Sequence, residues 1–142
     1  MKRLLISCLF TALFFSIQAQ VPTNLSNGVW QSALIRADGK TNLNGVEAYC
    51  TKSVCGNNDY VLIKFVNTNA YQVAVEWIDG IFADGNWTYS QNPTPKKVYV
   101  PASSTNEGTC FGEIKLKVMI SSLTNSTDQN IHFSVTGLKI SQ

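Results

Sequence analysis

Apolar residues recur at every second position along much of the chain. The clearest stretch is 114–120, where Ile114, Leu116, Val118 and Ile120 share one phase. The stretch 71–77 repeats the pattern, with Tyr71, Val73, Val75 and Trp77 expected to point inward. Such alternation predicts half-buried β-strands. No stretch after the first twenty residues keeps apolar residues at helical spacing for three turns. The sequence therefore predicts an all-β domain.

Strand connections can be predicted from the residues between these stretches. Residues 60–66 are apolar on both faces, and 67–70 (NTNA) predicts a turn that folds them into a hairpin with 71–77, giving two central strands. The last strand, 131–140, changes phase at Gly137, which predicts a β-bulge there. Residues 97–101 end in Pro101, which cannot donate to a ladder, so this strand is expected at a sheet edge.

Turn dipeptides divide the rest of the chain. Strands are expected at 29–36 and 46–50, and 90–95 (SQNPTP) is expected to be a loop. The four Asx-Gly turns expected are Asp38-Gly39, Asn44-Gly45, Asp79-Gly80 and Asp84-Gly85. Seven or eight short antiparallel strands favour a β-sandwich over a barrel. At the level of topology this pattern resembles an immunoglobulin-like domain without its tyrosine corner, and the resemblance implies no function.

The first nineteen residues have the layout of a secretory signal peptide. Lys2 and Arg3 precede a largely apolar run at 4–17, and we expect cleavage after Ala19, which leaves 20–142 as one domain in a secreted or periplasmic protein. A retained spanning helix is disfavoured because fourteen residues extend only about 21 Å. A lipidated Cys8 is disfavoured because only seven residues precede it.

The charge balance argues against nucleic-acid binding. The chain has eleven basic and nine acidic residues, and loss of Lys2 and Arg3 leaves nine of each, a net charge of zero. The remaining basic residues are scattered, whereas a phosphate-binding surface needs them clustered.

Three cysteines follow the predicted leader, so one thiol is left over if a disulfide forms. If the strands that start near Tyr60 and Glu113 run in the same direction in facing sheets, Cys55 and Cys110 lie at the same end. A link between them closes a loop of more than fifty residues, worth about 4 kcal/mol in the chain-entropy model. We expect this pairing, with Cys50 free. A bond from Cys50 to Cys110 is the alternative, and one from Cys50 to Cys55 closes only a small loop.

The inventory of reactive residues is sparse. His132 is the only histidine, which is too few for blue-copper or histidine-rich zinc sites, and alternation turns it outward beside Ser134 as a solvated side chain. A zinc site from three cysteines and His132 is disfavoured by loose spacing and an oxidising compartment. No G-x-S-x-G elbow or paired carboxylates stand out. We therefore expect no catalysis, no metal and no cofactor.

Two weaker motifs have simpler explanations. Residues 84–86 (DGN) share a fragment of a calcium loop but lack its later ligands, so a turn is expected. Three Asn-X-Ser/Thr sequons begin at Asn24, Asn86 and Asn125, close to the number that this asparagine-rich composition gives by chance.

The segment 77–89 (WIDGIFADGNWTY) is the one candidate recognition surface. Aromatic rings cover the C–H face of a sugar and nearby amides or carboxylates hold its hydroxyls. The candidate ligand-binding residues are Phe82, Asp84, Asn86, Trp87 and Tyr89. The structural alternative places Trp77 in the core and packs Phe82 across a hairpin from Trp87. We expect a non-catalytic binding module for a protein or glycan at a cell surface; the alternatives are an inhibitor or assembly partner that offers an edge strand, and a small hydrolase.

Overall fold

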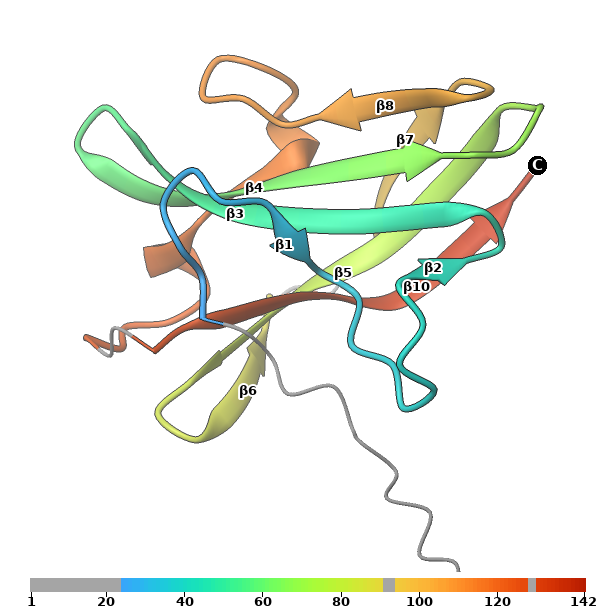
Figure 1. Cartoon of the computed structure of the whole chain (residues 1–142). Helices are drawn as coiled ribbons and strands as arrows, with labels where there is room; N and C mark the ends of the chain where they lie inside the picture. The colour runs from blue at the N-terminus through green and yellow to red at the C-terminus, as the bar shows by residue number, and fades with distance from the viewer. Residues whose placement is uncertain (1–23, 91–93, 128–129) are drawn as a thin grey trace, which may run out of the picture.

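The computed structural model describes residues 24–90, 94–127 and 130–142, and it is all-β (Figure 1). The predicted leader, 1–19, and positions 91–93 of the predicted loop lie outside these residues. Within the described ranges there is no α-helix, and no helix is long and apolar enough to cross a membrane.

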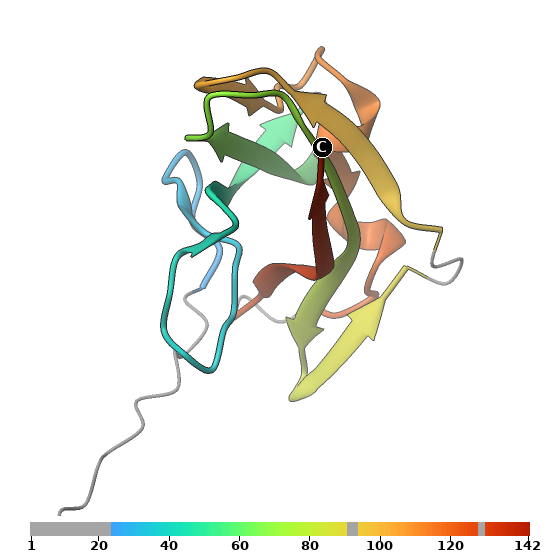
Figure 2. The same cartoon turned by 90° about the vertical axis from the view of Figure 1, so that its right-hand side faces the viewer.

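In the part of the chain that the structure describes, ten strands form two antiparallel sheets that face each other across one core (Figures 1 and 2). The six-stranded sheet has the order β1-β3-β4-β8, with β2 on β3 and β9 on β4. Its strands are β1 (Gln31–Ser32), β2 (Asn42–Leu43), β3 (Val46–Cys55), β4 (Asn58–Asn67), β8 (Ser104–Glu107) and β9 (Lys117–Met119). The four-stranded sheet has the order β10-β5-β6, with β7 also on β5. Its strands are β5 (Val73–Ala83), β6 (Asn86–Tyr89), β7 (Lys96–Val100) and β10 (His132–Ser141).

The core contains the inward residues of both sheets. Trp77 of β5 is fully buried, as predicted, and its ring lies 4.8 Å from that of Phe65 of β4. β4 and β5 have neighbours on both sides, which confirms that they are the central strands. Tyr71, expected to begin β5, lies before the strand and is exposed.

The expected turn at Asp79-Gly80 is wrong, because both residues continue β5. Asp79 points inward, as Trp77 does, and its carboxylate is buried. The carboxylate accepts a hydrogen bond from Trp77 Nε1 at 2.8 Å and forms an ion pair with Lys96 Nζ at 2.5 Å. These two donors satisfy the carboxylate inside the protein, so Asp79 does not need the solvent that a turn would provide.

The expected hairpin between 60–66 and 71–77 is also wrong. Residues 67–70 carry the chain from one sheet to the other, and β4 and β5 are not paired. The buried side chain of Asn67 holds this crossing, because its Nδ2 donates to the carbonyl oxygens of Tyr71, Val100 and Pro101 at 2.8, 3.1 and 2.9 Å. Its Oδ1 accepts from the backbone N–H of Asn69 at 3.0 Å.

Only the centre of the expected strand 114–120 is extended. The chain here forms the short 3-10 helix η1 (Ile114–Leu116), followed by β9 and by the 3-10 helix η2 (Ile120–Ser122). Leu116 and Ile120 are buried as the alternation predicts, but Ile114 is largely exposed. The alternation identified which side chains are buried, and 3-10 turns achieve that burial without a continuous strand.

Other local predictions are confirmed. The register of β10 shifts between Thr136 and Lys139, as expected for a bulge at Gly137. Positive φ angles occur at Gly39, and at both residues of Asn44-Gly45 and Asp84-Gly85, where these pairs close hairpins. β7 pairs only with β5, so it is an edge strand.

The bounds of other strands differ from the predicted ones. The first strand is shorter than the predicted 29–36, β3 extends beyond 46–50, and β8 was not predicted.

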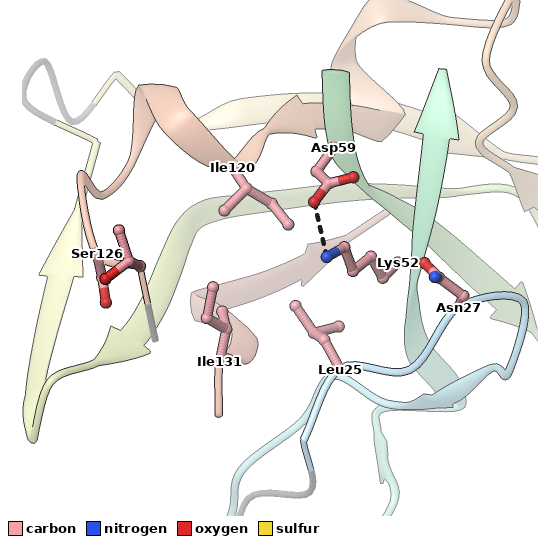
Figure 3. A pocket seen from close by; sticks show the side chains of 8 residues that line it. Leu25, Asn27, Lys52, Asp59, Ile120, Ser126 and Ile131 are labelled. Atoms are coloured by element: carbon pink, nitrogen blue, oxygen red, sulfur yellow. Dashed lines mark ion pairs between the residues drawn. The ribbon is translucent and has the colours of Figure 1, made fainter. Parts of the chain in front are cut away.

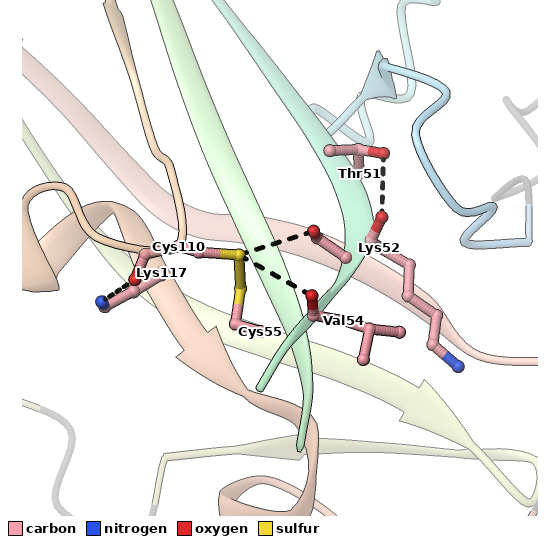
Figure 4. Close-up of a disulfide and its surroundings, with 7 residues drawn as sticks. Thr51, Lys52, Val54, Cys55, Cys110 and Lys117 are labelled. Carbon is pink, nitrogen blue, oxygen red and sulfur yellow. Dashed lines mark hydrogen bonds between the residues drawn. A yellow bond between two sulfur atoms is a disulfide. The ribbon is translucent and has the colours of Figure 1, made fainter. Parts of the chain in front are cut away.

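The Cys55–Cys110 disulfide is confirmed, with the Cα atoms 5.4 Å apart (Figure 4). The premise for this pairing was wrong, because β9 pairs antiparallel with β4 in the same sheet. Instead, β8 runs antiparallel along β4 from Asn67 toward the turn end of the β3–β4 hairpin, so the chain that follows β8, orange in Figure 1, reaches the end of β3 where Cys55 lies. Cys50 is free and buried, and this burial raises the pKa of its thiol to about 12.

Candidate functional site

The β5–β6 hairpin places an aromatic cluster on the outer face of the four-stranded sheet. Phe82 pairs with Trp87 and Gly80 with Tyr89, so these side chains share the face opposite Trp77. The rings of Trp87 and Tyr89 stack with centroids 6.5 Å apart and planes 13° apart, and Phe82 packs against Trp87 at 5.5 Å. The expected contact across the hairpin is thus present, and it also forms part of an accessible surface, since Tyr89 is 48% exposed.

A groove of about 400 Å³ lies beside this cluster. Trp87 and Tyr89 line it together with a segment before β2 and the middle of β10; the other lining residues are Leu34, Ile35, Arg36, Leu43, Ser134, Val135, Thr136, Gly137 and Leu138. A volume of this size is within the range of small-ligand sites.

Ala33 holds the 34–36 wall of the groove in place by bonding to both sheets. Its N–H donates to the carbonyl oxygen of Ala48 in β3 at 2.8 Å. Its carbonyl oxygen accepts from the N–H of Val135 and from Ser134 Oγ in β10, each at 3.0 Å. Because both sheets fix this residue, the adjoining wall is preorganised rather than a free loop.

Gly80 allows Tyr89 to lie close to the sheet. A Cβ at Gly80 would approach Tyr89 Cε1 to 3.2 Å and Thr136 Cγ2 to 3.1 Å, both tighter than ordinary contacts. The absence of a side chain on β5 at this position therefore sets the height of the Tyr89 ring above the sheet.

The groove also contains polar groups. The Arg36 guanidinium forms two bonds to the Asp38 carboxylate, Nε to Oδ1 at 2.8 Å and Nη2 to Oδ2 at 2.7 Å. These bonds hold the pKa of Asp38 well below its usual range and raise that of Arg36. Since a guanidinium has five N–H groups, others remain for a ligand. Thr136 contributes a hydroxyl that donates to the carbonyl oxygen of Ile78 and can still accept, whereas the Ser134 hydroxyl is buried and donates to the carbonyl oxygen of Ala33.

The structure groups three of the five predicted residues and separates two. Phe82, Trp87 and Tyr89 lie in one cluster. Asp84 and Asn86 are exposed at the hairpin tip, where Asn86 Nδ2 donates to the carbonyl oxygen of Asp84 at 3.0 Å, and neither lines the groove. The 34–36 wall was not predicted, because no local signal in the sequence places these residues beside β10.

His132 extends the aromatic cluster. It pairs with Phe82 on the outer face, and the two ring centroids are 5.7 Å apart. The expectation of a solvated histidine is wrong, because the residue is half-buried and its Nδ1 is shielded from solvent without a hydrogen-bond partner. No described contact gives His132 the carboxylate that orients the imidazole of a general base.

A second, polar cleft of about 470 Å³ lies at the end of the protein where β3 and β4 turn (Figure 3). Its lining includes Leu25, Ile120 and Ile131 and an ion pair of 2.7 Å between Lys52 Nζ and Asp59 Oδ2. No aromatic side chain is among the described residues that line this cleft, whereas Trp87 and Tyr89 line the groove. We therefore take the aromatic groove as the candidate site.

No protein-family model, curated protein or solved structure matches the chain. The candidate site is therefore assigned from the geometry and chemistry of this chain's own residues. Among the residues that the structure describes, no three His, Cys, Asp or Glu side chains are grouped as a metal site would require.

Proposed function

We propose that this protein is exported, folds as an immunoglobulin-like β-sandwich and binds carbohydrate without catalysis in the groove between Trp87, Tyr89 and the 34–36 wall. Export is supported by the leader pattern of residues 1–19 and by the Cys55–Cys110 disulfide, which is typical of an oxidising compartment. Two facing antiparallel sheets around one core support the sandwich.

The observation that carries the carbohydrate assignment is the pair of near-parallel rings beside polar groups. Trp87 and Tyr89 offer an apolar surface to the C–H face of a sugar. Arg36 N–H groups can donate to ring or hydroxyl oxygens, and the Thr136 hydroxyl oxygen can accept from a sugar hydroxyl. An aromatic wall opposite hydrogen-bonding groups is the combination that an amphipathic ring needs.

Strand addition to an edge is the competing binding mode, and side chains oppose it at β7. Lys115 Nζ donates to the carbonyl oxygen of Lys97 at 3.1 Å, and Asn106 Nδ2 donates to that of Tyr99 at 3.1 Å. These carbonyls would otherwise accept from an added strand, and Pro101 ends the strand. We therefore favour the groove over strand addition at β7.

Affinity electrophoresis tests the proposal. The protein is run through native gels that contain soluble starch, xylan, β-glucan or mannan, and retardation by any of them is followed by titration with the matching oligosaccharide, read by Trp fluorescence. Tyr89→Ala should weaken binding roughly tenfold or more through loss of ring contact. Gly80→Ala should also weaken it, because the added Cβ displaces the Tyr89 ring.

Tyr99→Ala is the matched control, because Tyr99 is 58% exposed on β7 of the same sheet and lies outside the groove. It should bind like the unaltered chain. Equal retardation of the Tyr89→Ala and Tyr99→Ala variants would refute the site, and an absence of retardation in all four polysaccharides would count against carbohydrate as the ligand.

A further inference from the structure

A turn after β8 exposes a large apolar side chain completely. Phe111 is 100% exposed and Ile114, three residues later, is 77% exposed. Neither lines the aromatic groove. Exposed apolar residues are common, so two at one turn indicate an interaction surface only where the neighbouring groups point to a partner.

Covalent and hydrogen bonds fix this turn. The Cys55–Cys110 disulfide attaches the residue before Phe111 to the end of β3 (Figure 4). The Gly112 N–H donates to the carbonyl oxygen of Thr109 at 3.2 Å, which closes the turn, and Lys117 Nζ donates to the carbonyl oxygen of Cys110 at 2.6 Å. The backbone that carries Phe111 is thus fixed, so binding through Phe111 costs little further conformational entropy.

The apolar area is small for a protein partner. Two side chains of this size offer about 300 Å², whereas a stable protein interface buries about 800 Å² on each side. A lipid interface does not need a complementary pocket, because a projecting side chain inserts into a fluid layer and each inserted group adds to the affinity.

The charges beside the turn favour an anionic surface. Lys115 is exposed, and Lys117 is half-buried; the partners of both ammonium groups are backbone carbonyl oxygens, which leave their charge in place. The two positive charges exceed the single negative charge of residues 108–117, that of the exposed Glu113. Basic groups behind an apolar tip are attracted by anionic headgroups.

We propose that the turn of Phe111 and Ile114 is a membrane-docking tip, which inserts into the interface of an anionic lipid bilayer with Lys115 and Lys117 among the headgroups. Docking through this tip leaves the aromatic groove unoccupied. The proposal does not depend on carbohydrate binding, and it places the protein at a lipid surface whatever the groove binds.

Vesicle flotation tests the proposal. The full protein and its variants, prepared in the same way, are mixed with vesicles of phosphatidylcholine or of equal parts phosphatidylcholine and phosphatidylglycerol. Any leader that remains contributes equally to each preparation. Phe111→Ser should lower the partition coefficient on the mixed vesicles about tenfold or more. Lys115→Gln should lower it several-fold on the mixed vesicles, with a smaller change on phosphatidylcholine alone.

The Tyr99→Ser variant is the control, because it removes an exposed aromatic ring that belongs to β7 and not to this turn. It should float like the unaltered chain. Equal partition of the Phe111→Ser and Tyr99→Ser variants, or no flotation of the unaltered chain, would overturn the proposal. Concentration-dependent self-association in sedimentation velocity that disappears with Phe111→Ser would also overturn it, because a second copy would then be the partner.

Discussion

Asn67→Asp replaces one side-chain NH₂ by oxygen and leaves the shape unchanged. The amide that it removes donates to three carbonyl oxygens, those of Tyr71, Val100 and Pro101, at the crossing between the sheets. The new carboxylate would instead present oxygen to those three acceptors at hydrogen-bonding distance. The substitution therefore tests whether this amide holds the crossing.

The expected cost follows from the groups left without partners. Two N–H donors are lost at about 1 kcal/mol each, and a buried oxygen that faces carbonyls adds about 1–3 kcal/mol. We expect the free energy of unfolding to fall by about 3–5 kcal/mol at pH 7. A domain of this size has about 5–15 kcal/mol in total, so the loss is a large fraction.

The cost should depend on pH in a known direction. Burial beside carbonyl oxygens raises the pKa of the new carboxyl in the folded state above its unfolded value of about 3.9. The folded variant then binds more protons than the unfolded one, so its penalty grows as pH rises above that value and shrinks as pH falls through it. A protonated carboxyl can also donate to one carbonyl.

Urea denaturation at pH 3, 5 and 7, followed by circular dichroism, measures both effects. Asn106→Asp is the matched control, because the exposed Asn106 amide donates to only one carbonyl, that of Tyr99. The control should lose less than about 1 kcal/mol. Equal stability of the two variants at pH 7, or a penalty for Asn67→Asp that does not change with pH, would refute the reasoning.

Three further predictions concern the disulfide and two buried groups. Replacement of both Cys55 and Cys110 by Ser should lower the unfolding free energy by about 4 kcal/mol in the chain-entropy model, and calorimetry showing an unchanged Tm would contradict it. In the chain without residues 1–19, which contain Cys8, Ellman's reagent should not react with the buried Cys50 thiol at pH 8 until urea unfolds the protein, and then it should release one equivalent. Asp79→Ala should cost about 3–5 kcal/mol in urea denaturation, whereas Glu76→Ala, in an exposed ion pair on the same strand, should cost less than about 1 kcal/mol; similar losses would contradict this.

Local chemistry predicted much of the fold. Asn44-Gly45 and Asp84-Gly85 require left-handed backbone, which few other residue pairs adopt, so their turns were readable without a partner strand. The bulge at Gly137 was readable because a change of phase must occur where the backbone gains a residue. Such features depend on neighbours in the sequence.

The wrong turn predictions concern residues whose side chains bond to groups distant in the sequence. Asn67 has turn chemistry, yet its amide bonds to residues of the opposite sheet and so produces a crossing rather than a hairpin. Asp79-Gly80 also has turn chemistry, yet Lys96 and Trp77 supply the donors that keep the carboxylate buried. Each case needs a partner more than fifteen residues away or from another strand, which a single sequence does not identify.

The candidate site divides in the same way. Phe82, Trp87 and Tyr89 belong to one hairpin, so an Asp-Gly turn and alternation were enough to place them together. The opposite wall exists because Ala33 bonds to β3 and to β10, residues far from it in the chain. A groove needs both sides, so the sequence could predict the aromatic surface but not its concavity. Substitutions that weaken the Ala33 contacts should therefore impair binding although no aromatic residue is changed. This result would distinguish binding in a groove from binding to a flat aromatic surface.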